Sequence, residues 1–213
     1  VTIEEAEHMM ATRLWQNTAK VHFDTSARPD EVLALFPGGD EVGAHFGGIL
    51  VRESGYQFEI ATFRTDGPYL DGRHPESVTF TTAREAAQRR DFTINALFYD
   101  IATFAIVDHV GGLQDIEQRK IRAIGDAGTR FQEDPVRMVR AVRFASRLGF
   151  EVERDTYQAI LKCAGHIMVA SAPRLYEEVL KLFPFGSSES SFRLLRRCFL
   201  LREKFPELDA FPA

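Results

Sequence analysis

The sequence predicts an α+β fold, in which a small mixed unit of strands and helices is followed by an all-helical one. Strand-like segments separated by turn residues dominate before about residue 115. After that point, apolar residues recur at helical spacing. The 213 residues are 45% hydrophobic and 27% charged, which is an ordinary globular composition and excludes a disordered or fibrous chain.

The first half is expected to hold two helices and several strands. Pro29 suits the first turn of a helix, because its fixed φ matches that position. Turn residues at 53–55 separate two strand-like segments and so predict a β-hairpin. The expected elements are helices at 3–17 and 29–36, a hairpin of 46–51 with 58–64, a strand at 77–82 and a second hairpin within 98–107.

The second half is expected to be a series of helices. Asp134 is placed as an N-cap with Pro135 in the first turn, and Gly149 is placed at the end of the same helix. Further helices are expected at 155–164, 173–182 and 191–204, with a break at 184–188 and a proline-containing coil at the end of the chain.

Composition excludes several classes of protein. Cys163 and Cys198 are the only two cysteines, so disulfide-dense scaffolds and four-cysteine zinc sites are excluded. No apolar run approaches the roughly 20 residues of a membrane helix, and the acidic N-terminus does not resemble a secretory signal. We therefore expect a cytoplasmic protein without a membrane partner.

Charge is distributed unevenly along the chain. The net charge is −5, yet residues 119–147 hold eight basic and three acidic side chains, a local net charge of +5. Residues 1–60 hold ten acidic and four basic side chains, a net charge of −6. A basic block in an acidic chain indicates a local site for anions such as phosphates.

The densest group of polar side chains is Arg89, Arg90, Asp91 and Asn95. Two adjacent guanidinium groups suit phosphate oxygens, and Asp91 can orient a guanidinium or accept from a ribose hydroxyl. Asn95 follows Asp91 by four residues, so the two share a face if the segment is helical. The alternative is a helix start with solvated charges.

A second group of arginines is spaced for one side of a helix. Arg137, Arg140, Arg143 and Arg147 would form a ridge of like charges, which repel by up to about 0.5 kcal/mol per pair. An anionic ligand would remove this repulsion. The alternatives are a solvated charged face, an i,i+4 ion pair of Arg137 with Glu133, and a helix-capping role for Asp134.

These segments resemble the bacterial tRNA nucleotidyltransferase and poly(A) polymerase family, class II. The resemblance covers about residues 24–182, and its motifs occur in the family's order. The matching segments are 58–64, 66–73, 89–96 (RRDFTINA), 108–115 (DHVGGLQD), 133–144 (EDPVRMVRAVRF) and 174–181 (RLYEEVLK).

The resemblance implies a polymerase-β-like nucleotidyltransferase head with a mixed or antiparallel sheet at 1–115. A helical neck at 116–185 and the start of a truncated helical body at 186–213 would follow. It implies an enzyme that adds C or A residues from CTP or ATP to an RNA 3′ end, of tRNA or mRNA, without a template and with release of pyrophosphate. Mg²⁺ is the implied cofactor, and the oligomeric state stays open.

The resemblance also assigns roles within the nucleotide-binding set, to which Asn95 belongs. Arg89, Arg90 and Asp91 would hold the triphosphate and the ribose. Asp134 and Arg137 would read the base edge, supported by Arg140 and Arg143. A carboxylate accepts from the exocyclic amino group that cytosine and adenine share, whereas uracil and guanine present a carbonyl there.

One family motif is altered in this chain: a Gly-rich turn with an Arg, followed by two aspartates separated by one residue. An ungapped alignment puts Lys20 and His22 at the aspartate positions, and a two-residue contraction puts His22 and Asp24 there. Asp24 and Glu59 are therefore the candidate catalytic and metal-binding residues. Glu59 is equally explained as an outward-facing strand residue.

Three explanations of this difference stay open: the segment is absent from the sequence as given, it is deleted or frameshifted in the gene, or catalysis is lost. The alternative function is accordingly a non-catalytic nucleotide- or RNA-binding remnant of the same family. A third hypothesis is an α+β domain whose arginines form ion pairs only.

Overall fold

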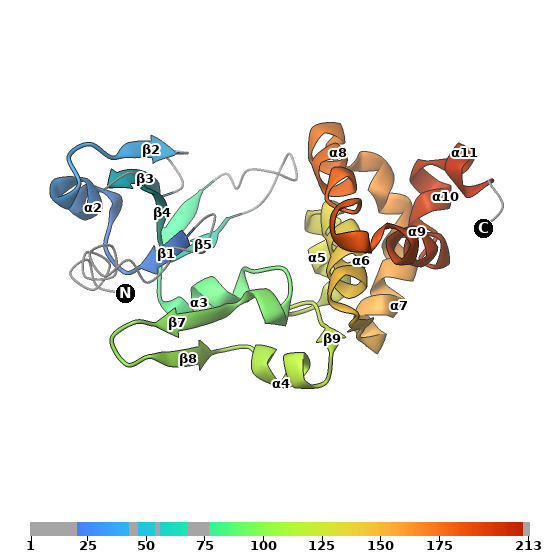
Figure 1. Ribbon diagram of the computed structural model, residues 1–213, viewed down its shortest axis with the longest axis horizontal. Coiled ribbons are helices and arrows are strands. Elements are labelled where there is room, and N and C mark those ends of the chain that lie inside the picture. The colour runs from blue at the N-terminus through green and yellow to red at the C-terminus, as the bar shows by residue number, and fades with distance from the viewer. Residues whose placement is uncertain (1–20, 43–46, 54–55, 68–76, 211–213) are drawn as a thin grey trace. The chain divides into compact units, whose positions relative to one another are not determined.

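The computed structural model describes residues 21–42, 47–53, 56–67 and 77–210 (Figure 1). These residues form two compact units. The first contains 21–67, 77–89 and 98–107 within that range, and the second contains 90–97 and 108–210. The expected helix at 3–17 and part of the turn at 53–55 lie outside the described residues.

The first unit is built on a four-stranded sheet of order β1-β4-β3-β2. Its strands are β1 (Val21–Thr25), β2 (Asp40–Val42), β3 (Gly48–Glu53) and β4 (Tyr56–Thr62). β1 runs parallel to β4, whereas β3 is antiparallel to both of its neighbours, so the sheet is mixed. The α+β class and the hairpin of β3 with β4 are confirmed.

One face of this sheet forms a small core with α2 (Pro29–Leu35), the helix expected after Pro29. Phe58 and Ile60 alternate along β4 as buried residues, and Phe23 of β1 and Val32 of α2 pack with them. Because side chains alternate between the faces of a strand, Asp24 and Glu59 belong to the opposite face.

The remaining strands of the first unit form two-stranded pairs. β5 (Arg64–Asp66) pairs antiparallel with β6 (Val78–Phe80), and β7 (Leu97–Asp100) pairs with β8 (Ala105–Asp108). Both expected features, the strand near 77–82 and the hairpin within 98–107, are confirmed. Between them lies α3 (Ala83–Gln88), whose N-terminus is capped by Thr82.

The second unit is almost entirely helical (Figure 1). Its elements are η2 (Thr93–Asn95), α4 (Gly112–Glu117), β9 (Lys120–Ile121), α5 (Ala127–Glu133), α6 (Val136–Leu148), β10 (Glu151–Val152), α7 (Arg154–Cys163), η3 (Ala164–Val169), α8 (Ala172–Leu180), η4 (Pro184–Gly186), α9 (Ser188–Arg197), α10 (Leu200–Lys204) and α11 (Pro206–Asp209).

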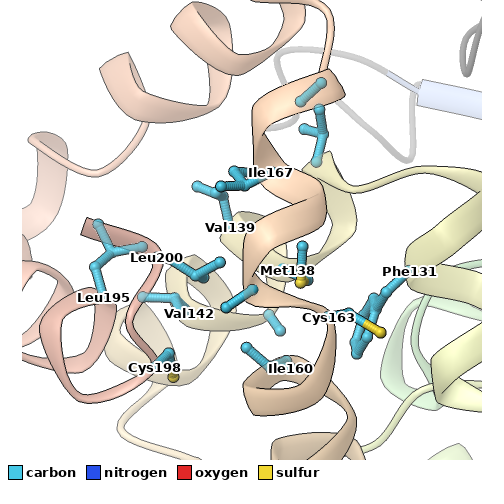
Figure 2. Close-up of a cluster of buried hydrophobic side chains, with 14 of the residues drawn as sticks. Phe131, Met138, Val139, Val142, Ile160, Cys163, Ile167, Leu195, Cys198 and Leu200 are labelled. Carbon is cyan, nitrogen blue, oxygen red and sulfur yellow. The ribbon is translucent and has the colours of Figure 1, made fainter. Parts of the chain in front are cut away.

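Helix α6 lies at the centre of the core of this unit. Met138, Val139 and Val142 are buried on its apolar face, where they pack among residues of α5, α7, η3 and α9 (Figure 2). Gly149 ends the helix with φ +66°, as expected for a left-handed C-terminal residue. The helix begins at Val136 rather than Pro135, and the Asp134 carboxylate accepts from the Val136 N–H at 3.2 Å.

The expectation of one helix over 191–204 is wrong. The chain forms α9 and α10 instead, and the break falls at Phe199, whose φ of +62° is left-handed. This change of direction buries Leu200 and Leu201 together with Leu195. The expected terminal coil is also partly helical, because Pro206 begins the short helix α11.

Gly112, the first residue of α4, lies against η2 with no room for a side chain. A Cβ atom there would lie 2.3 Å from the carbonyl oxygen of Thr93. We expect Gly112→Ala to lower the free energy of unfolding by about 1–3 kcal/mol, because the backbone must shift to relieve the overlap. Denaturant unfolding measures this loss, and Gly165→Ala, which meets nothing within 4 Å, is the matched control. Equal stability of both variants would contradict the close packing.

Candidate functional site

Asp91 lies two residues before the 3-10 turn η2, and backbone pairing fixes this segment in place of an α-helix. The Thr93 N–H donates to the Arg122 carbonyl at 3.0 Å, and the Ile124 N–H donates to the Asp91 carbonyl at 3.1 Å. Asn95 nevertheless contacts Asp91 as expected, since its Nδ2 donates to Asp91 Oδ1 at 3.0 Å.

The turn rests on a buried polar group that includes α4. The Thr93 hydroxyl donates to Asp115 Oδ2 at 2.7 Å, and Arg122 Nε lies 3.0 and 3.1 Å from the two oxygens of the same carboxylate. Arg122 also pairs with Glu153 at 3.4 Å. Asp115 is 3% exposed, so its charge is compensated by these two donors rather than by bulk water.

Arg140 of α6 binds the Asp91 carboxylate directly. Arg140 Nε and Nη2 lie 2.7 and 2.6 Å from Asp91 Oδ2. Burial raises the pKa of Asp91, but Arg140, Asn95 and the Phe92 N–H together outweigh it and lower the pKa below its usual value. The structure therefore keeps this carboxylate ionised beside a guanidinium.

Glu178 of α8 joins two arginines of α6. Its two oxygens accept from Arg140 Nη1 at 3.1 Å and from Arg143 Nε at 2.8 Å, and Lys181 Nζ lies 2.9 Å away. Glu178 is 5% exposed and Arg143 is 7% exposed. Burial raises the pKa of Glu178, but the three cations outweigh it and lower the pKa overall.

Arg137 and Asp134 lie at the start of α6, and each has a charged partner. Arg137 Nη1 donates to Glu133 at 2.9 Å, which confirms the expected i,i+4 ion pair. Asp134 receives both ends of the Arg174 guanidinium, at 3.0 and 2.6 Å. Asp134 is 6% exposed and Arg137 is 8% exposed, so neither lies on a solvated face.

The four arginines of the ridge do lie on one helix, as their spacing predicted. They differ from the expectation in that three of them are paired with carboxylates of the protein. Glu133, Asp91 and Glu178 pair with Arg137, Arg140 and Arg143, so carboxylates of the protein already offset the mutual repulsion of these cations. Arg147 alone among the four residues of the ridge is exposed.

Arg89 and Arg90 fall at the end of α3 and in the following turn. Arg89 is the C-terminal cap residue of α3 in the first unit, whereas Arg90 belongs to the second unit. The Arg90 carbonyl accepts from Arg130 Nη2 at 2.8 Å, and Arg130 also pairs with Glu133. Arg90 is thus connected to the start of α6 through Arg130 and Glu133.

Asp24 and Glu59 share one face of the sheet of the first unit. Asp24 pairs with Ala61 in the register of β1 and β4, and Glu59 lies two residues before Ala61. Glu59 is exposed, as strand alternation predicts. In the part of the chain that the structure describes, no group of three or more His, Cys, Asp or Glu side chains could hold a metal ion.

Sequence reasoning missed three residues of this arrangement: Glu178, Arg174 and Asp115. A signal existed for Glu178, because Leu175, Glu178 and Leu182 recur at helical spacing and Glu178 occupies a core-facing position among apolar residues. Arg174 and Asp115 carry no such signal, since their partners Asp134 and Thr93 lie 40 and 22 residues away in the sequence.

Two protein families match the chain. Residues 12–122, just over half of the chain, match the poly A polymerase head domain. Residues 149–211 match a family described as the probable RNA and SrmB-binding site of polymerase A. Among the described residues, none of the helices has the length and apolar character needed to cross a bilayer.

Individual relatives agree with these matches. A CCA-adding enzyme of Geobacillus thermodenitrificans is 46% identical over 170 residues, which are 78% of this chain and 42% of that protein. A CCA-adding enzyme of Bacillus pumilus is 40% identical over 197 residues, covering 92% of this chain and 49% of that protein. The crystal structure of the Bacillus stearothermophilus CCA-adding enzyme in complex with CTP superposes with a TM-score of 0.74 at 39% identity, covering 85% of this chain and 44% of that one. The chain thus spans less than half the length of these relatives.

Proposed function

We propose a function from the premise that the chain belongs to the family of the poly A polymerase head domain. It is the head and neck part of a template-independent RNA nucleotidyltransferase that adds C and A residues from CTP and ATP to tRNA 3′ ends. Relatives described as CCA-adding enzymes, one of them in complex with CTP, support this choice over polyadenylation. The two free, buried cysteines fit a cytoplasmic location.

The observation that carries the proposal is the ion-pair network of the second unit. Asp91, Arg140 and Glu178 form one series of charge-assisted contacts. Arg137 lies one turn before Arg140 on α6, and Asp134 lies just before the helix begins. Such a network holds guanidinium groups in fixed orientations, which is what recognition of phosphate and base edges requires. In this proposal, Arg89, Arg90, Asp91 and Asn95 bind the triphosphate and ribose.

Asp134 and Arg137 are proposed to read the base. Asp134 Oδ1 accepts from both Arg174 and the Val136 N–H, whereas Oδ2 accepts from Arg174 and has a second lone pair that can accept from an amino group of cytosine or adenine. Arg137 Nη1 donates to Glu133 and to the Arg130 carbonyl, and Nε lies 3.9 Å from Asp134 Oδ2, which leaves Nη2 for a ring nitrogen or a carbonyl of the base. Arg174 and Glu133 thus orient the two readers without saturating them.

A divalent metal ion is the third part of the proposal. Divalent ions are the family's cofactors, and we propose Mg²⁺ as the ion, with Asp24 and Glu59 as the candidate ligands. Because the described carboxylates do not form a complete site, we assign no reaction step to a metal.

Two measurements test the function. Titration with CTP, ATP, GTP and UTP is expected to show preference for CTP and ATP, and equal weak binding of all four would reject the nucleotide site. Incorporation of labelled CMP or AMP into a tRNA lacking its CCA end, with and without Mg²⁺, then separates an enzyme from a binding protein. Selective binding without incorporation would support the alternative function.

Arg137→Ala and Arg90→Ala are expected to change nucleotide binding in different ways. Loss of a base-reading contact should reduce the preference for CTP over UTP by about 1–3 kcal/mol in Arg137→Ala, roughly a 5- to 150-fold loss of discrimination. Arg90→Ala should weaken all four nucleotides alike, because a triphosphate contact does not depend on the base. Titration of each variant with the same four nucleotides checks this, and an unchanged preference in Arg137→Ala would remove its role as a reader.

A further inference from the structure

A cleft on the helical unit, away from Asp91 and Asp134, gathers three arginines. Its volume is about 570 Å³, and its lining comes from the end of α6, from β10, from the start of α7 and from α9. Arg154, Arg193 and Arg197 line it together with Tyr157. We call it the arginine cleft.

Contacts within the unit fix the walls of this cleft. Arg193 and Arg197 lie four residues apart on α9, and Arg154 and Tyr157 lie three apart on α7, so each pair faces one side of its helix. The Tyr157 hydroxyl donates to the Arg197 carbonyl at 3.3 Å, which ties the two walls together.

The cleft is cationic because its positive charges exceed its negative ones. Glu151 is the one acidic residue of the lining, and its carboxylate binds Lys120 Nζ at 2.6 Å. Arg193 pairs with Glu189 at the surface. Arg154 and Arg197 form no side-chain ion pair or hydrogen bond with any part of the chain that the structure describes.

The floor of the cleft adds apolar and hydroxyl groups to the guanidiniums. Phe150, Val152 and Leu194 supply the apolar part. Ser146 also lines the cleft, and its buried Oγ has no hydrogen-bond partner among the described residues. Guanidiniums, a tyrosine ring and hydroxyls around an apolar floor are suited to a polynucleotide, which presents phosphates, sugar hydroxyls and flat base faces together.

We propose that the arginine cleft binds the phosphodiester backbone of the RNA substrate at a point distinct from the nucleotide site. Arg154 and Arg197 are the phosphate-binding residues, and Tyr157 supplies a surface for the adjoining nucleoside. This inference rests on the proposed function, since it takes RNA as the substrate. It names the contact residues within a region that the family description connects with RNA only as a whole.

The test compares two double variants of the full chain that remove the same charge. Arg154→Gln/Arg197→Gln alters the cleft, and Arg84→Gln/Arg202→Gln removes two exposed arginines outside it. A labelled tRNA transcript without its CCA end is titrated with each protein by fluorescence anisotropy at several KCl concentrations, and CTP affinity is measured in parallel.

The cleft variant is expected to bind the transcript about tenfold more weakly than the control variant, with unchanged CTP affinity. The slope of log affinity against log salt concentration should fall by about 1.4–1.8 as two phosphate contacts are lost. Equal RNA affinity of the two double variants, or no RNA binding by the unmodified chain, would overturn the proposal that the arginine cleft binds RNA. Neither result affects the selectivity for CTP and ATP, which tests the nucleotide site separately.

Discussion

Glu178→Gln is expected to lower the free energy of unfolding by about 3–5 kcal/mol, because it removes the anion that compensates the buried guanidinium of Arg143 and the partly buried one of Arg140. Glu178 contacts Arg140 at 3.1 Å and Arg143 at 2.8 Å, and its side chain is 6% exposed. The amide keeps the shape of the carboxylate but not its charge. Denaturant unfolding at neutral pH measures the loss.

The neighbouring residue on α8 provides the matched control. Glu177 is exposed, so Glu177→Gln removes the same charge one position away and is expected to change stability by less than about 0.5 kcal/mol. If both variants lost equal stability, the effect would come from net charge and not from the buried network.

The same network predicts a pH dependence. The folded-state pKa of Glu178 is lowered, so its contribution is fully present above the unfolded value of about 4.3 and is lost as pH falls through the folded value. Glu178→Gln should therefore flatten the acid limb of the stability curve. Nucleotide affinity should also fall, because Arg140 loses one of the two carboxylates that orient it.

The local sequence pattern was sufficient to predict those elements of the fold that are defined by residues close in sequence. The hairpin of β3 and β4 follows from alternation around a turn, and α6 follows from apolar spacing that ends at Gly149. The break at Phe199 could not be predicted, because a phenylalanine with positive φ carries no local signal and its position is set by burial of Leu200 and Leu201.

In the candidate site, too, features set by nearby residues could be predicted and features set by distant segments could not. Arg137, Arg140 and Arg143 were identifiable as one group because their spacing is helical, and the pair of Asp91 with Asn95 was identifiable because they are near neighbours. The sequence did not reveal that these arginines point inward, because their direction depends on carboxylates supplied by other segments, above all Glu178 on α8. Spacing reports which side of a helix a residue occupies, but tertiary packing decides whether that side meets water.

Asp115→Ala is expected to lower the free energy of unfolding by about 2–3 kcal/mol and to weaken binding of all nucleotides. The substitution leaves the buried Thr93 hydroxyl without its acceptor and deprives Arg122 Nε of the two carboxylate oxygens to which it donates. Because Thr93 lies two residues after Asp91, freedom gained at Thr93 misplaces the carboxylate that Arg140 binds. Urea unfolding and CTP titration measure the two effects.

A double-mutant cycle with Thr93→Val isolates the contact between these two side chains. The coupling should be about 0.5–3 kcal/mol, since Thr93→Val adds little once Asp115 is gone. Thr93→Ser retains the hydroxyl and should retain CTP affinity, which a loss of packing alone would not predict. The control is Thr129→Val, whose hydroxyl binds Asp126 at 2.6 Å but on the exposed surface of α5. If Thr93→Val and Thr129→Val were equally mild, or if Thr93→Ser failed as Thr93→Val does, Asp115 would not position the turn through this hydrogen bond.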